Sequence, residues 1–166
     1  SRPRAAGCSS GNAELIGNDL IVTLSADCNP ANADPAVLMP KQLGSIMHET
    51  GHNLGLGHGG TILQPDGTFL IDNTGYKPNH LSVMNYAFQF PGVGTTVDAT
   101  GRYVGGAYDF CRAQLVDLNE NGGLDEPTGI IPGLWDLALM TRYVCPGATR
   151  ATLTAAVGGQ PINWGL

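Results

Sequence analysis

The pattern of apolar and polar residues predicts few regular elements in this chain. Asp19–Leu24 is rich in aliphatic and β-branched residues, which predicts a strand. From Pro40 to Leu54 the apolar residues recur with helical spacing, which predicts an amphipathic helix. The apolar positions of this helix are Leu43, Ile46, Met47 and Leu54. Cys28–Pro35, between the strand and the helix, is rich in turn-forming residues and is expected to be a loop.

The remaining sequence is dominated by glycine and polar residues. Residues 1–12 are polar and glycine-rich and are predicted to form an extended or mobile arm. A glycine-rich stretch runs from His58 to about Leu81, with a turn signal at Pro65–Gly67 and a short predicted strand at Thr68–Ile71. Two short helices are expected near Asp109–Leu118 and Gly133–Tyr143. There is no internal repeat, and the elements together predict an α+β fold.

Composition narrows the class of protein. A chain of 166 residues with 42% hydrophobic residues is large enough for one domain with its own core and is too apolar for a disordered segment. The net charge is −6 and the only lysines are Lys41 and Lys77, so there is no basic patch for nucleic acid. No apolar run approaches the ~20 residues that span a bilayer, and no signal peptide is present. We therefore expect the mature form of a secreted protein with no membrane partner.

The four cysteines are Cys8, Cys28, Cys111 and Cys145, an even number without a CxxC pair. In a secreted protein this predicts two disulfides, and we expect Cys8–Cys28 and Cys111–Cys145, one on each side of the predicted helix. The alternatives are a cysteine zinc site and reduced structural thiols.

The stretch HETGHNLGLGH carries the clearest chemical signal. Residues four apart share one face of a helix, so His48 and His52 can present two imidazoles to one metal ion. Gly55 allows the chain to leave the helix in a conformation that is costly for other residues, and His58 then supplies a third nitrogen. Three protein ligands with one open position are typical of a catalytic zinc site, and Glu49 is placed to act as its general base. The alternative is a helix whose histidines are ordinary surface or core residues.

Further along, SVMNY contains Met84 and Tyr86. HExxHxxGxxH followed by a Met-turn resembles the metzincin zinc peptidases. The resemblance implies that Met84 forms an apolar floor beneath the zinc histidines. It also implies that Tyr86 is catalytic, because the tyrosine at this position in the astacin and serralysin branches binds the metal or stabilises the oxyanion. Gly59, after the third histidine, matches none of the best-known subfamilies, so the resemblance is to the clan as a whole.

The resemblance implies a secreted zinc endopeptidase in which water activated by the metal, with Glu49 as general base, hydrolyses a protein or peptide substrate. It also implies one catalytic domain, with an upper subdomain at residues 1–58 and a loop-rich lower subdomain at 59–166. The strand at Asp19–Leu24 is expected at the sheet edge, where a peptide can pair with it.

Only 47 residues precede His48, so the upper sheet is expected to be reduced or truncated. In the truncated case, a missing N-terminal segment or propeptide is a further partner. One alternative function is a metzincin-like module that binds zinc and peptide without productive catalysis. Another is a calcium-stabilised structural or adhesive domain.

The segment Asp117–Glu126 resembles a calcium-binding loop. Its oxygen ligands would come from Asp117, Asn119 and Asn121, with Asp125 or Glu126 in place of the usual acid at the twelfth position, which is Thr128. An acidic surface turn is the alternative. His80, the only histidine outside the zinc motif, is expected to be a surface or loop residue, with substrate contact or proton transfer as the alternative.

Overall fold

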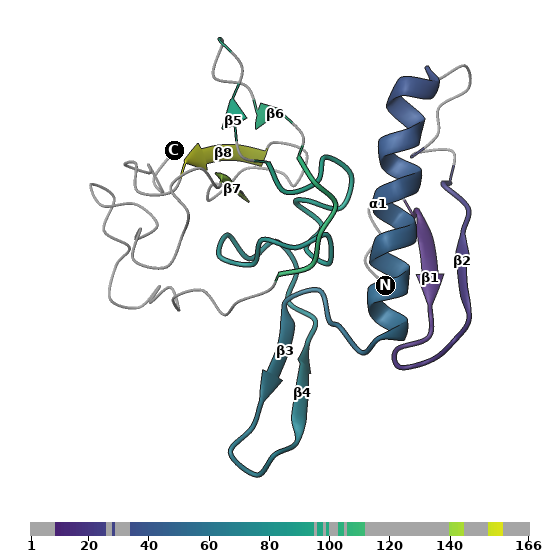
Figure 1. Cartoon of the computed structure of the whole chain (residues 1–166), viewed down its shortest axis with the longest axis vertical. Coiled ribbons are helices and arrows are strands. Elements are labelled where there is room, and N and C mark those ends of the chain that lie inside the picture. Colours follow the sequence, from purple (N-terminus) through teal and green to yellow (C-terminus); the bar gives the residue numbers. More distant parts are fainter. Residues whose placement is uncertain are drawn as a thin grey trace, which may run out of the picture.

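The computed structural model describes residues 9–25, 28, 34–94, 96–97, 99, 103–104, 106–111, 140–144 and 153–157. Within these residues the fold is α+β, as predicted, with one helix, α1 (Pro35–Asn53), and short antiparallel strand pairs (Figure 1). The pairs are β1 (Gly11–Ala13) with β2 (Leu20–Val22), β3 (Gly60–Leu63) with β4 (Phe69–Asp72), β5 (Thr96–Val97) with β6 (Tyr103–Val104), and β7 (Met140–Val144) with β8 (Leu153–Val157). No helix in this described part of the chain is long and apolar enough to cross a membrane.

The helix α1 begins five residues before the predicted start at Pro40. Asp34 is its N-cap, and the Asp34 carboxylate accepts a hydrogen bond from Ala36 N at 2.9 Å. Pro35 occupies the first helical turn, where a proline loses no helical hydrogen bond. The predicted loop at Cys28–Pro35 is therefore wrong at its last residue, because Asp34 and Pro35 together form a stronger helix start than Pro40. Pro40 lies inside the helix.

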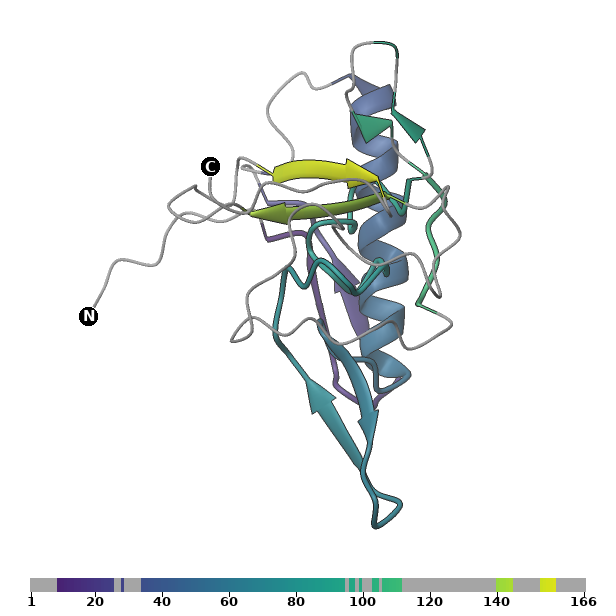
Figure 2. The same cartoon turned by 90° about the vertical axis from the view of Figure 1, so that its left-hand side faces the viewer.

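The end of α1 is held by the turn that joins β1 to β2. Ile16 N donates to His52 O at 3.1 Å, and Gly17 N donates to Asn53 O at 3.2 Å. The last carbonyls of a helix lack partners within the helix, so these bonds fix the turn against it. Both views show β1 and β2 lying alongside α1 (Figures 1 and 2).

The strand predicted at Asp19–Leu24 is confirmed as β2. The extended or mobile arm predicted for residues 1–12 is extended at its end, where Gly11 and Asn12 belong to the strand β1. Gly11 pairs with Val22, and Ala13 pairs with Leu20. A Cβ atom at Gly11 would lie 2.8 Å from Glu49 Oε1. The missing side chain of Gly11 therefore lets β1 pass directly next to the glutamate of the zinc motif, which the polar composition of this segment did not indicate.

The glycine-rich stretch after His58 contains a hairpin that the sequence predicted only in part. The predicted strand at Thr68–Ile71 is confirmed as β4, and its partner β3 was not foreseen. Gly67 has φ +83° in the turn between them, a conformation that glycine adopts at little cost. The hairpin projects away from α1 in both views (Figures 1 and 2).

The core lies where a turn-rich segment, residues 81–93, packs on α1. Its buried apolar side chains are Leu81, Val83, Met84, Ala87 and Phe88. The two parts approach closely at two glycines of the helix. A Cβ atom at Gly44 would overlap the carbonyl of Gln89, and one at Gly51 would overlap the sulfur of Met84. These glycines allow the turn-rich segment to lie directly on the helix backbone.

The helix predicted at Gly133–Tyr143 is wrong over its last four residues, because Met140–Val144 is the strand β7. Threonine, tyrosine and valine favour strands. β7 forms an antiparallel pair with β8, which begins at Leu153. Asp109–Cys111, the described start of the other predicted helix, is not helical. Residues 112–139, which include the rest of both predicted helices up to Leu139, lie outside the described residues.

Cys28 is fully buried and disulfide-bonded. Its expected partner Cys8 lies outside the described residues, so that pairing stays a prediction. The expected disulfide Cys111–Cys145 is wrong, because Cys111 carries a thiol and forms no disulfide. The division of one catalytic domain into subdomains at residue 58 also stays a prediction.

Candidate metal centre

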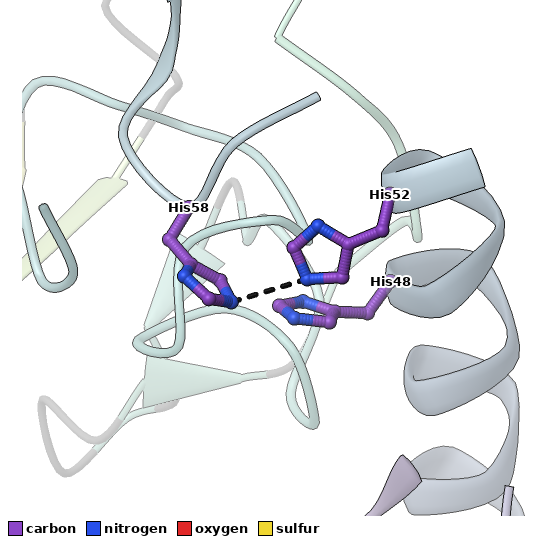
Figure 3. A group of neighbouring side chains, drawn as sticks. All are labelled: His48, His52 and His58. Atoms are coloured by element: carbon purple, nitrogen blue, oxygen red, sulfur yellow. Dashed lines mark hydrogen bonds between the residues drawn. The ribbon is translucent and has the colours of Figure 1, made fainter. Parts of the chain in front are cut away.

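Three histidine side chains converge at the end of α1. His48 and His52 project from successive turns of the helix, and His58 reaches the same point from the segment that follows it (Figure 3). One ring nitrogen of each lies within 4.8 Å of the other two, and Nε2 of His52 is 3.1 Å from Nε2 of His58. The structure thus brings together three imidazoles that can hold one metal ion.

A tight reversal of the chain brings His58 back to the helix. Gly55 has φ +86°, as the sequence predicted for the residue that leaves the helix. Gly55 N donates to His52 O at 2.8 Å, and Leu56 N donates to Gly51 O at 2.9 Å. These bonds close the last helical turn, so His58 follows at a fixed distance from the two helical histidines.

Two backbone carbonyls fix the protons of the helical histidines. His48 Nδ1 lies 2.9 Å from Val83 O, and His52 Nδ1 lies 2.9 Å from Leu56 O. A carbonyl only accepts, so Nδ1 is the protonated nitrogen in each ring and Nε2 keeps its lone pair for a metal ion. In a tetrahedral zinc site with Zn–N bonds of about 2.05 Å, two ligand nitrogens lie about 3.3 Å apart. The observed 3.1 Å between His52 and His58 fits this spacing.

The electrostatic setting also favours neutral rings. The pKa of His48 is lowered to about 4, mainly by burial. The neighbouring His52 and His58 contribute to the decrease, and the hydrogen bond to Val83 opposes it. Burial and the nearby His52 lower the pKa of His58 to about 4, and burial lowers the pKa of His52. At pH 7 all three imidazoles are therefore neutral, which is the form that binds metal.

Glu49 follows His48 in α1 and is 4% exposed. Its carboxylate faces the backbone of Gly11 in β1, and burial raises the pKa of Glu49 to about 7. Among the described residues, the cluster able to hold a metal consists of the three histidines and does not include Glu49. Glu49 is therefore a buried carboxylate, one residue after His48, that is not part of this cluster.

Tyr86 lies next to His58 in the histidine cluster. Its hydroxyl oxygen is 2.8 Å from His58 Nε2, and its ring centroid is 4.4 Å from that of His58 and 5.5 Å from that of His48. The side chain is 39% exposed, so a ligand can reach it from solvent. The structure thus brings this predicted site residue to the histidines.

Met84 is 1% exposed and packs against Gly51, which lies between His48 and His52 in α1. This places an apolar side chain against the helix at the level of the two histidines. The role of Met84 as a floor beneath the zinc histidines stays a prediction.

Other predicted site residues lie elsewhere. The candidate calcium ligands Asp117, Asn119, Asn121, Asp125 and Glu126 lie outside the described residues. His80 is in a loop, as expected, but its Nε2 is buried and makes no hydrogen bond with the described part of the chain. The pKa of His80 is lowered to about 4, mainly by burial and also by the charge of Lys77, while Asp72 opposes the shift.

Sequence reasoning missed the groups that orient the site. The carbonyls of Val83 and Leu56 belong to residues whose side chains carry no chemical signal, so no motif could have indicated them. The pair Gly44 and Gly51, seven residues apart on one helix face, is a signal that could have revealed close packing against α1.

Comparison with protein-family models, with curated proteins and with solved structures gives no match. The resemblance to metzincins therefore rests on the motif residues, and the argument for function rests on the geometry of the site.

Proposed function

We propose that this protein is a secreted zinc endopeptidase of the metzincin type. The observation that carries the proposal is a set of three convergent imidazoles together with a buried carboxylate, Glu49, which directly follows His48 in α1 and is not one of the ligands. A structural zinc site usually has four protein ligands, whereas a catalytic site has three and keeps one position open. Neutral imidazole binds several transition metals, and three nitrogen ligands with an adjacent glutamate are typical of zinc hydrolases.

When bound, zinc makes water nucleophilic near neutral pH and polarises the scissile carbonyl. The residues of this chain supply the proton transfers. Glu49 takes a proton from the attacking water and delivers it to the nitrogen of the leaving amine. Its enclosure between α1 and β1 holds the carboxylate in place and limits its exchange with solvent.

Tyr86 is suited to stabilise the oxyanion that forms from the scissile carbonyl. Its hydroxyl lies beside His58 Nε2, which is one of the atoms that would bind zinc. A phenol at this point can donate a hydrogen bond to the negative oxygen of the tetrahedral intermediate. Because Tyr86 is partly exposed, a substrate can reach this side chain from solvent.

An extended peptide is the substrate that the strand next to Glu49 favours. Within the described residues β1 pairs with β2 alone, so its other edge has no strand partner. Gly11 in β1 lies next to Glu49, so we expect a peptide backbone that pairs with this edge to run close to the glutamate. Main-chain pairing also tolerates many side chains. An extracellular location is supported by the disulfide at Cys28.

The alternative is a module that binds zinc and peptide without turnover. The small size of the sheet on α1, two strands among the described residues, favours it, because a reduced sheet offers less support to a bound substrate. The buried Glu49 favours the enzyme, since a site that only binds has no use for a general base.

Zinc content and cleavage, measured together, test the proposal. The purified chain is analysed by inductively coupled plasma mass spectrometry and assayed on quenched casein and gelatin, before and after ortho-phenanthroline and after zinc is restored. We expect one zinc per chain and cleavage that is lost and regained with the metal. One zinc without cleavage would support the binding module, and failure to bind zinc would refute both proposals.

A further inference from the structure

Asn85, between Met84 and Tyr86 in the sequence, is fully buried and uses all of its hydrogen-bonding capacity. Its Oδ1 accepts from Tyr76 N and from Ala87 N, both at 3.1 Å. Its Nδ2 donates to Lys77 O at 2.7 Å and to His80 O at 3.0 Å. Three of the four bonds go to Gly75–His80, which we call the 75–80 loop. Asn85 thus connects this loop by hydrogen bonds to the turn that contains Tyr86.

The 75–80 loop lies against the ring of Tyr86. A Cβ atom at Gly75 would be 3.0 Å from Tyr86 Cδ2 and 3.4 Å from Cε2, so the glycine backbone lies flat on the ring. The ring of Tyr76 is 5.7 Å from that of Tyr86, centroid to centroid. Tyr76 has φ +62°, a conformation that is costly for a tyrosine and persists only where the surroundings hold it. Its N–H bond to Asn85 is such a constraint.

The same loop is joined to the residue that follows His58. Lys77, whose carbonyl accepts from Asn85, donates from Nζ to Gly59 O at 3.4 Å and forms an ion pair with Asp72. The loop therefore contacts both Tyr86 and the backbone next to His58. It can set the distance between the phenol and the third histidine.

We propose that Asn85 is a positioning residue, which acts through the 75–80 loop to hold the Tyr86 hydroxyl beside His58 at the metal centre. A partly exposed tyrosine has several side-chain rotamers, and a catalytic hydroxyl must occupy one of them. Asparagine suits this position because one buried side chain must donate two hydrogen bonds and accept two. The placement of Tyr86 by Asn85 follows from the contacts described above. Only the effect of this placement on catalysis rests on the proposed peptidase function.

The test compares Asn85→Asp with Asn73→Asp. Aspartate at 85 keeps the size and the Oδ1 acceptor, but as a carboxylate it cannot donate to the carbonyls of Lys77 and His80. Asn73 is exposed near the same loop, so its replacement controls for the added charge. The first readout is the nuclear Overhauser effect between the ring protons of Tyr86 and His58, which needs no activity. We expect it to weaken strongly in Asn85→Asp and to persist in Asn73→Asp, with one zinc bound by each variant.

The second readout is kinetic. We expect Asn85→Asp to lower kcat roughly 10- to 100-fold with little change in KM, because misplacement of a catalytic group by about 1 Å can cost up to 10²-fold. In a Tyr86→Phe background the same substitution should cost almost nothing further, since the hydroxyl it positions is already absent. A purely structural role would lower activity equally in both backgrounds.

Two further variants keep the test decisive. If the buried carboxylate of Asn85→Asp prevents folding, Asn85→Ser removes the amide that donates to Lys77 and His80, and the amide oxygen as well, without adding a charge. Gly75→Ala presses a methyl group onto the Tyr86 ring and should weaken the same Overhauser effect while Asn85 stays intact. An unchanged effect in a folded Asn85 variant would overturn the proposal. If the wild-type chain binds zinc but cleaves nothing, the peptidase function fails, and the Overhauser effect still decides the role of Asn85.

Discussion

The sulfur of Met84 lies against the backbone of Gly51, the residue before His52 in α1. A Cβ atom at position 51 would overlap this sulfur and approach Phe110 Cε1 to 2.9 Å. The residue before Met84, Val83, accepts the hydrogen bond from His48 Nδ1. One short turn therefore supports the helical histidines twice, by packing and by fixing a ring proton.

We predict that Gly51→Ala weakens both the fold and the metal centre. The added methyl group must displace Met84, and overpacking of this kind costs about 1–3 kcal/mol. Displacement of Val83 disturbs the hydrogen bond to His48, and loss of such outer contacts lowers metal affinity by about 10- to 100-fold. Urea unfolding and competitive zinc titration measure the two effects. Gly67→Ala, in the β3–β4 turn, is the control, since it strains a positive φ but should leave zinc affinity unchanged.

We predict that His58→Gln abolishes stoichiometric zinc binding, whereas His80→Gln retains it. His58 belongs to the cluster of three imidazoles, and His80 does not. Two ligands cannot hold zinc as three do, because each imidazole supplies a separate bond to the ion. Zinc content after exhaustive dialysis measures the difference. Equal zinc content in the two variants would show that His58 is not a zinc ligand.

We predict that Glu49→Gln keeps one zinc per chain and loses nearly all turnover. Glutamine has the same shape but cannot accept the proton of the attacking water, and general-base catalysis contributes about 10²- to 10⁴-fold. Cleavage of quenched casein, normalised to zinc content, gives the measurement. The control is Glu14→Gln in the β1–β2 turn, which keeps an oxygen acceptor for Asn18 N. Cleavage by Glu49→Gln at the wild-type rate would exclude Glu49 as the base.

We predict that the chain, once stripped of metal by chelation, loses stability as the pH falls from 6.5 toward 4. His48, His58 and His80 have folded pKa values of about 4, against 6.5 ordinarily, so in this window the unfolded chain binds protons that the folded chain excludes. Glu49 acts in the opposite direction, because its folded pKa of about 7 lies above the ordinary 4.5. Three histidines outweigh one glutamate, so the free energy of unfolding should fall.

Variants at these positions check the sign of each contribution. In urea unfolding between pH 7.5 and 4.5, His80→Gln should show a shallower loss of stability, because one excluded proton is removed. Glu49→Gln should show a steeper loss, because the opposing group is gone. A free energy of unfolding that does not change over this range would contradict the assignment.

Local signals identified several elements from sequence alone. The β-branched run at Asp19–Leu24 identified β2, because this composition favours an extended backbone whatever lies beside it. Periodic apolar residues identified most of α1 but not its first turn. The strands β1 and β7 escaped prediction because each depends on a partner elsewhere in the chain, β2 or β8.

What the sequence determined by itself is the donor set of the candidate centre. The spacing of His48 and His52 on a helix, and the positive φ that Gly55 permits, follow from backbone geometry within eleven residues. Only the tertiary structure decided how these donors are oriented and enclosed. The carbonyl of Val83, the sulfur of Met84, the phenol of Tyr86 and the backbone of Gly11 reach the site from distant segments. Such contacts depend on how the segments pack, and packing has no local signature in the sequence.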